Sequence, residues 1–201
     1  AASDVYKRQP ENKSIVSGQV LQCPYSFDKA RLVVREMADA LALDLVDKGL
    51  VTNQLVLTVG YDIENLVSAQ GTAAYTGAVT MDRYGRKIPK HAVGTENFPY
   101  TSSANDLLEA VASLYDRIAD KALLVRRLSI SANRLLREDE VPRQDEAEQM
   151  DLFTDYAARE KERAESAAEH ARERKLQETM LEIKKKFGKN AICLLYTSPS
   201  P

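Results

Sequence analysis

The chain has 201 residues, a formal net charge of −2 at pH 7 and two cysteines. That length suits one domain of ordinary size with additional segments. Two cysteines exclude a disulfide framework and a cysteine-rich metal cluster, and no apolar run reaches the roughly 20 residues of a membrane span. We therefore expect a protein of the reducing cytoplasm that has no membrane partner.

The two ends of the sequence fit no pattern around them. Residues 1–9 (AASDVYKRQ) and 193–201 (CLLYTSPSP) resemble translated sequencing adapter. Both are left out of the fold prediction, as for any appended segment. We expect the remainder to be a fragment of a longer protein.

Apolar periodicity predicts a strand, a helix and a second strand in the first part of the chain. Lys13–Leu21 alternates as a strand does. Ser26 is a candidate N-cap, and apolar residues then recur at helical spacing until Gly49 ends the run. Gln54–Tyr61, rich in β-branched residues, is the second predicted strand.

A hairpin is predicted after an irregular segment at residues 62–77. Its arms, Ala78–Asp82 and Arg86–Val93, flank the turn 83–85, whose glycine suits a tight turn. The hairpin is basic, because a single acid, Asp82, stands beside four cations: Arg83, Arg86, Lys87 and Lys90.

The last predicted elements of the domain are a helix and a strand. Ser103 is a candidate N-cap with Asp106 at the third helical position, and Ala122–Leu135 is the final strand. The order strand–helix–strand–strand–helix–strand predicts an α+β domain at residues 10–137 with a ferredoxin-like, split βαβ fold. Two helices then cover one face of the sheet and leave the other face open.

Charge sorts between the two sides of this predicted domain. On the final strand, the residues expected on the open face are Arg127, Ser129, Ser131 and Asn133. The two helices carry the acids Asp28, Glu36, Asp39, Asp44, Asp47, Asp106, Glu109, Asp116 and Asp120. A basic sheet side suits a polyanion such as a nucleic-acid backbone. The alternative is that mixed charges merely solvate both surfaces.

A polar linker at residues 138–154 carries one apolar pair. Its segment Gln149, Met150, Asp151, Leu152 and Phe153 resembles the short motif with which bacterial polymerases and repair proteins dock on the sliding clamp. In that motif the glutamine amide lies at the pocket edge and the two apolar side chains fill a cleft. The alternative is that Leu152 and Phe153 pack on this chain's own domain.

A charged helix is predicted at residues 155–188. Its middle is dense in charge and lacks an apolar seam, which favours a solvated single helix over a coiled coil. An apolar patch, formed by Leu176, Met180, Leu181 and Ile183, could dock on a partner, on other domains of the parent chain or on nothing. We predict no catalytic residue and no metal ligand, and His91 and His170 are interpreted as surface residues.

Several stretches of the domain resemble the C-terminal little-finger domain of Y-family DNA polymerases, the translesion enzymes. They are Lys13-Ser14-Ile15, residues 18–21, 25–31, 82–87, 101–103 and 124–127, and Gln149–Tyr156. The resemblance runs from about Pro10 to Ile192 and is strongest for bacterial polymerases of the IV/V type. The long segment 62–100 departs from the family, whose members connect these strands more tightly.

The resemblance implies a function in DNA repair and in the bacterial SOS response. A little finger grips the backbone of primer-template duplex DNA through its sheet. The residues expected to do so are Lys13, Ser14, Arg83, Arg86, Lys87, Lys90, Arg127, Ser129, Ser131 and Asn133. Family members hold Mg²⁺ in a separate palm domain, so the resemblance implies no cofactor in this chain and no nucleotide incorporation by it alone.

The partners implied are duplex DNA, the sliding clamp and the remaining polymerase domains of the parent chain. The competing hypothesis is a non-enzymatic adaptor, with a ferredoxin-like domain and a helical tail that binds a partner.

Overall fold

The computed structural model describes residues 14–67, 75–141, 156–188 and 191, and for residues 156–164 it describes the helical backbone alone. The main sheet contains strands β1 (Ser14–Tyr25), β6 (Val125–Asn133), β2 (Leu50–Tyr61) and β5 (Ala92–Thr101), in that order. Each neighbouring pair is antiparallel, and the short β7 (Leu136–Arg137) pairs with the start of β2.

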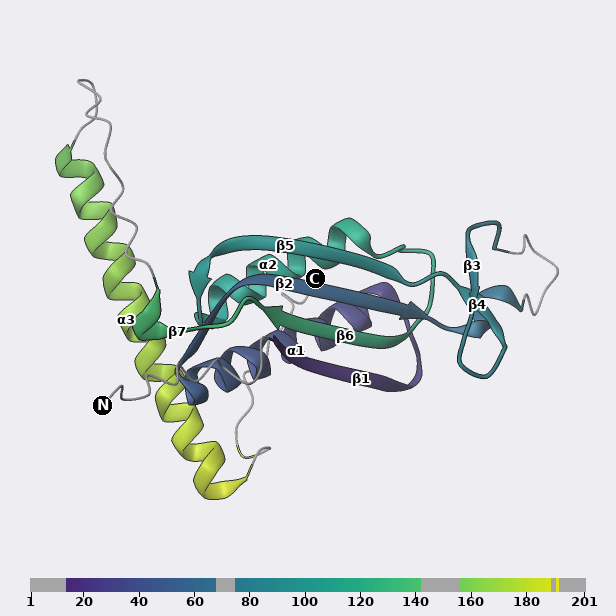
Figure 1. Ribbon diagram of the computed structural model, residues 1–201, viewed down its shortest axis with the longest axis horizontal. Helices are drawn as coiled ribbons and strands as arrows, with labels where there is room; N and C mark the ends of the chain where they lie inside the picture. The colour runs from purple at the N-terminus through teal and green to yellow at the C-terminus, as the bar shows by residue number, and fades with distance from the viewer. Residues whose placement is uncertain (1–13, 68–74, 142–155, 189–190, 192–201) are drawn as a thin grey trace, which may run out of the picture.

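The order of the strands makes both βαβ units split. β6 lies between β1 and β2, which helix α1 (Phe27–Lys48) connects, and β2 lies between β5 and β6, which helix α2 (Ala104–Ile118) connects. Figure 1 shows α1 and α2 on the same side of the sheet. The predicted split βαβ fold of the α+β class is therefore confirmed.

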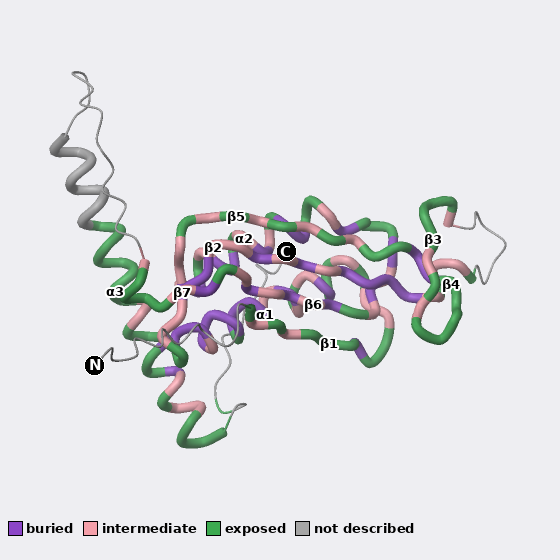
Figure 2. The backbone as a smooth tube through the Cα atoms, viewed as in Figure 1, coloured by how far each residue is buried: buried purple, intermediate pink, exposed green. Residues whose placement is uncertain are grey.

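The core lies between the sheet and these two helices. Leu55, Leu57 and Val59 of β2 alternate with half-buried residues and are fully buried, as strand geometry requires when one face is covered. Figure 2 shows the buried residues concentrated in β2, β6 and the inner sides of α1 and α2. The edge strand β1 contributes a single buried residue, Leu21.

The predicted helix ends are confirmed, with one difference in their chemistry. Gly49 has a φ of 63°, the left-handed conformation of a helix C-cap, and ends α1. Ser103 caps α2, and its Oγ accepts a 3.2 Å hydrogen bond from the Asp106 N–H. Ser26 stands at the N-cap of α1, but its side chain makes no capping hydrogen bond there.

The predicted second arm of the hairpin divides into two strands. The hairpin consists of β3 (Val79–Met81) and β4 (Lys87–Pro89), which form a separate two-stranded sheet. The third strand of the main sheet is β5, most of which the sequence did not indicate. Its segment GTENFPYT contains Gly94 and Pro99, residues that weaken a strand pattern but are tolerated at a sheet edge, where β5 lies.

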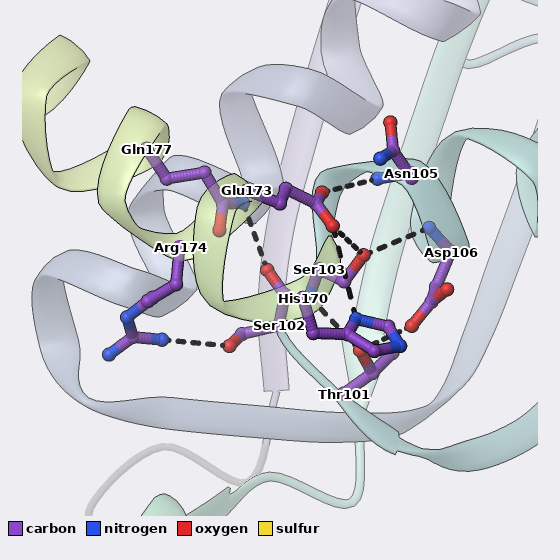
Figure 3. Close-up of polar contacts among 9 residues, drawn as sticks. All are labelled: Thr101, Ser102, Ser103, Asn105, Asp106, His170, Glu173, Arg174 and Gln177. Atoms are coloured by element: carbon purple, nitrogen blue, oxygen red, sulfur yellow. Dashed lines mark hydrogen bonds and ion pairs between the residues drawn. The ribbon is translucent and has the colours of Figure 1, made fainter. Parts of the chain in front are cut away.

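Helix α3 (Tyr156–Phe187) packs against the domain along its C-terminal half, at the opposite end of the sheet from the hairpin (Figure 1). Residues 165–172 are exposed, as expected for a solvated helix, whereas Gln177 and Met180 are buried. Figure 3 shows the polar contacts of this interface, among them the 3.1 Å hydrogen bond from the Gln177 amide to the Ser102 carbonyl. The Met180 side of the apolar patch thus lies on this chain's own domain.

Two further residues of α3, Arg174 and Lys185, hold the helix in place. Arg174 donates to Ser102 Oγ at 3.1 Å and forms an ion pair with Glu138 at 3.0 Å. Glu138 belongs to the 3-10 helix η2 (Glu138–Glu140), which directly follows β7. Lys185 pairs with Asp47 near the end of α1. The chain on both sides of residues 142–155 is therefore attached to the same end of the domain.

Candidate nucleic-acid interface

The open face of the sheet carries the side chains of β6 that alternate with its buried ones. Leu128, Ile130 and Ala132 are fully buried against the helices. The residues between them are half-buried or exposed, and these are the predicted Arg127, Ser129, Ser131 and Asn133. The predicted orientation of this strand is confirmed.

Pairing with both neighbouring strands places these four residues along the middle of the open face. Ser129 lies between Gly18 of β1 and Thr58 of β2. Asn133 lies between Ser14 and Gln54 in the same way. The structure therefore brings the predicted Ser14 together with the residues of β6.

Several polar side chains of this face are hydrogen-bonded to one another within the sheet. Ser131 Oγ donates to Asn133 Oδ1 at 2.8 Å, and the Gln54 amide donates to Asn97 Oδ1 at 2.9 Å. Asn133 Nδ2 lies 3.4 Å from Gln54 Oε1, which joins these pairs into one network across three strands. Ser129 makes no side-chain hydrogen bond to another described residue, and so its hydroxyl is available to a ligand.

The sheet itself is nearly uncharged on its open side. At the described positions that face this side, Arg127 is the one charged residue, and no carboxylate is present. Val16, Val20 and Val93 are 63%, 64% and 62% exposed there. The expected positive charge is therefore concentrated in the hairpin, and the sheet contributes mainly small polar and apolar side chains.

The hairpin turn is held by one carboxylate. Asp82 accepts hydrogen bonds from the Tyr84 N–H at 2.8 Å, the Arg86 N–H at 2.9 Å and Arg86 Nε at 2.8 Å. The bond from the Arg86 N–H is the main cause that lowers the pKa of Asp82 below its usual range. Gly85, with a φ of 74°, adopts the left-handed conformation that the turn needs. The guanidinium carbons of Arg83 and Arg86 lie 5.6 and 5.3 Å from the centre of the Tyr84 ring.

The acids of the two helices lie on the covered side of the sheet, as predicted, with two differences, the first being that Asp120 follows the end of α2 at Ile118. Asp39 is buried, and so it does not add to the acidic surface. Asp116 of α2 is engaged by Arg31 of α1 through two hydrogen bonds of 2.8 Å, which join the two helices. Because these acids lie on the helix side, they do not repel a polyanion from the open face. They repel it from the opposite side of the domain.

A groove of about 640 Å³ lies where the hairpin meets the end of the open face. Besides Arg83, Arg86 and Arg127, it is lined by Gly60, His91 and Arg126, which the sequence did not indicate as site residues. One signal was available, because a glycine inside a strand marks a close approach of other groups. Lys87 and Lys90 are exposed and do not line this groove.

Two of the predicted sites lie outside the described residues. These are Lys13 and the segment Gln149, Met150, Asp151, Leu152 and Phe153. Within the described part of the chain, no group of three or more His, Cys, Asp or Glu side chains is arranged to hold a metal ion. Among the same residues, no helix has the length and apolar character needed to cross a bilayer.

Comparison with known proteins decides the family. The family model of the impB/mucB/samB family C-terminal domain matches residues 12–152, well over half of the chain. The chain belongs to this family. The impB/mucB/samB C-terminal domain is the little finger of Y-family DNA polymerases, so the resemblance drawn from the sequence is confirmed.

The impB/mucB/samB match covers every strand of the domain but ends before α3 begins. No curated protein matches the chain at a significant level. A solved complex of the beta-clamp processivity factor and the little finger domain of PolIV is similar at 8% identity and a TM-score of 0.37, over 60% of this chain and 86% of that one. A similarity at this level adds nothing to the family assignment, which rests on the family model.

Proposed function

We propose that this little-finger domain grips the backbone of primer-template duplex DNA with its open sheet face and its hairpin, as part of a bacterial translesion polymerase in the cytoplasm. The observation that carries the proposal is the sorting of charge in a member of this family. The open face has Arg127 and no carboxylate at its described positions, while the exposed acids of α1 and α2 lie on the other side. No carboxylate at these described positions repels a polyanion from the open face.

The neutral character of the sheet suits a sequence-independent grip. Hydroxyl groups such as that of Ser129 can donate to phosphate oxygens without reading a base. Exposed valines allow close approach to sugars, and a few cations then supply the salt-dependent part of the affinity. A polymerase that passes damaged template needs contacts that do not depend on the bases.

Duplex binding is tested by the affinity of the chain for a labelled DNA duplex over a range of salt concentrations. Each phosphate contact that is lost reduces the slope of log K against log salt by about 0.9. Arg127→Ala should therefore weaken binding and reduce the steepness of the slope by about 0.9, the value for one phosphate contact. An affinity that does not depend on salt, or an absence of binding by the unaltered chain, would reject the proposal and favour the adaptor.

We further propose that Gln149 to Phe153 tethers the domain to a sliding clamp. The proposal rests on the match of Gln149, Leu152 and Phe153 to the clamp-binding pattern. Burying two apolar anchors contributes several kcal/mol, roughly 2 or more for each hot-spot residue. The Leu152→Ala, Phe153→Ala double variant should lose binding to a bacterial clamp, with Arg127→Ala as a control that keeps it. Equal binding by the double variant would show that these two side chains do not act as the anchors.

A further inference from the structure

The two outer strands of the main sheet differ in how their free edges are protected. Among the described residues, β1 pairs with β6 alone and β5 pairs with β2 alone. Figure 1 shows β1 at the free margin of the sheet. An edge strand presents a row of backbone N–H and C=O groups without partners, to which a strand of another molecule can add. Natural proteins therefore cover or interrupt such edges with prolines, charges or side chains.

The edge at β5 carries several of these protective features. Pro99 has no N–H to donate, and Glu96 places a charge on the strand. The Thr95 carbonyl accepts a hydrogen bond from Arg117 of α2 at 3.4 Å, so a side chain of the domain covers the edge at that point. Addition of a further strand to β5 is therefore unfavourable.

The edge at β1 lacks these features over residues 14–20. The strand SIVSGQVLQCPY contains no Asp, Glu, Lys or Arg, although 29% of the residues of the chain are charged. Residues 14–20 pair with β6 without a break in register. After Val20 the register shifts, Pro24 has no N–H, and Arg126 donates to the Gln22 carbonyl at 2.9 Å. The unprotected part of this edge is therefore residues 14–20.

We infer that β1 pairs antiparallel with β1 of a second copy of this chain, so that the two sheets join into one. Antiparallel pairing of a strand with its own copy has two-fold symmetry, the commonest symmetry of homodimers. Since residues 14–20 are uncharged, no like charges face each other across this pairing. The joined sheet has β5 at both outer edges, and so the unprotected edges of both copies are removed in one contact.

The exposed side chains of β1 suit the same pairing. In a continuous antiparallel sheet the open faces of the two copies lie on the same side. Val16 and Val20 are 63% and 64% exposed on that side, and in the dimer they lie beside the strand of the second copy. Cross-strand contacts of β-branched side chains stabilise antiparallel pairs. The pairing itself uses backbone groups of β1 and is separate from the proposed duplex contact.

Sedimentation equilibrium of the full chain tests this dimer, at protein concentrations from about 1 μM to about 1 mM, the range of weak to moderate association. A reductant is present, because the exposed Cys23 could otherwise cross-link two copies. Val16→Lys places a cation at the proposed interface. Val93→Lys is the matched control, since Val93 is 62% exposed and faces the open side from the protected strand β5. Urea unfolding of both variants verifies that the domain still folds.

The unaltered chain and Val93→Lys should dimerise equally well. Val16→Lys should dimerise at least about tenfold more weakly, because each dimer then holds two lysines close to the paired strands. Amide hydrogen exchange at residues 14–20 should slow as the concentration of the unaltered chain rises, while exchange in β5 should not change. A monomer at every concentration would overturn the inference. A dimer that Val16→Lys and Val93→Lys weaken equally, or that leaves exchange in β1 unchanged, would also overturn it, since its interface would lie elsewhere.

Discussion

Glu173 of α3 and Ser103 at the start of α2 are hydrogen-bonded across 70 residues of chain, with Ser103 Oγ donating to Glu173 Oε2 at 2.7 Å. The other carboxylate oxygen accepts from the Asn105 N–H at 2.8 Å. The first N–H groups of a helix lack partners within the helix, and negative charge there is favourable. A side chain from outside the family-matched residues thus completes the first turn of a helix inside them (Figure 3).

Glu173→Ala should lower the free energy of unfolding by about 1–2 kcal/mol, because it removes both the hydrogen bonds and the charge at the α2 terminus. Glu169→Ala, one turn earlier on the exposed side of α3, makes the same change of residue without these contacts and should stay within about 0.5 kcal/mol. Urea unfolding measures both. Equal losses in the two variants would mean that α3 does not cap α2.

Gly94→Ala should destabilise the domain by about 1–3 kcal/mol through overpacking. A Cβ on Gly94 would lie 2.7 Å from both Leu114 Cδ1 and Ile118 Cγ2, so that α2 lies directly on the strand at this point. Gly18→Ala is the matched control in β1, where the nearest atoms would be 3.9 Å away. Thermal unfolding should separate the two variants, and a Gly94→Ala chain as stable as Gly18→Ala would contradict this packing.

Tyr115→Phe should change how stability depends on alkaline pH. Burial raises the pKa of the fully buried Tyr115 well above its usual value of about 10, and its hydroxyl donates to the Phe27 carbonyl at 3.0 Å. Below about pH 10 both states keep this proton, whereas at higher pH only the unfolded chain releases it, and stability falls.

Denaturant unfolding at pH 8 and at pH 10.5 checks this behaviour. The variant should be less stable than the original chain at pH 8 by about 1 kcal/mol, since it lacks the hydrogen bond. It should also lose less stability than the original chain between the two values of pH. Parallel losses in the two proteins would mean that Tyr115 does not stay protonated in the folded state.

Asp82→Asn should loosen the hairpin turn without unfolding the domain. The amide side chain is a weaker acceptor for the Tyr84 and Arg86 N–H groups, and β3 and β4 form a sheet of their own. The pKa of Asp82 is lowered in the folded state, and so the stability that its carboxylate contributes is present above the unfolded pKa of about 3.9. This stability is lost as the pH falls through the folded pKa. Amide hydrogen exchange at Tyr84 and Arg86 should become faster, while exchange in β2 should stay unchanged.

The structural features that depend on residues close together in the sequence could be predicted well. The caps Gly49 and Ser103, the two helices of the domain and the alternation of β6 follow from local spacing and local backbone conformation. The extent of β5 could not be predicted, because an edge strand with Gly94 and Pro99 is held by its pairing with β2 and not by its own pattern. The groove residue Gly60 was missed for the same reason, since its neighbours are distant in the chain.

By itself, the sequence determined the fold class, the family and the residues that face the open side, because these follow from periodicity and from motifs that lie within short stretches. Only the tertiary structure decided three other properties: the near-neutral sheet face, the basic groove around Gly60 and the position of α3 on the domain. Each of these depends on which distant segments meet. A contact such as that of Glu173 with Ser103 arises only when the sheet and its helices have been assembled.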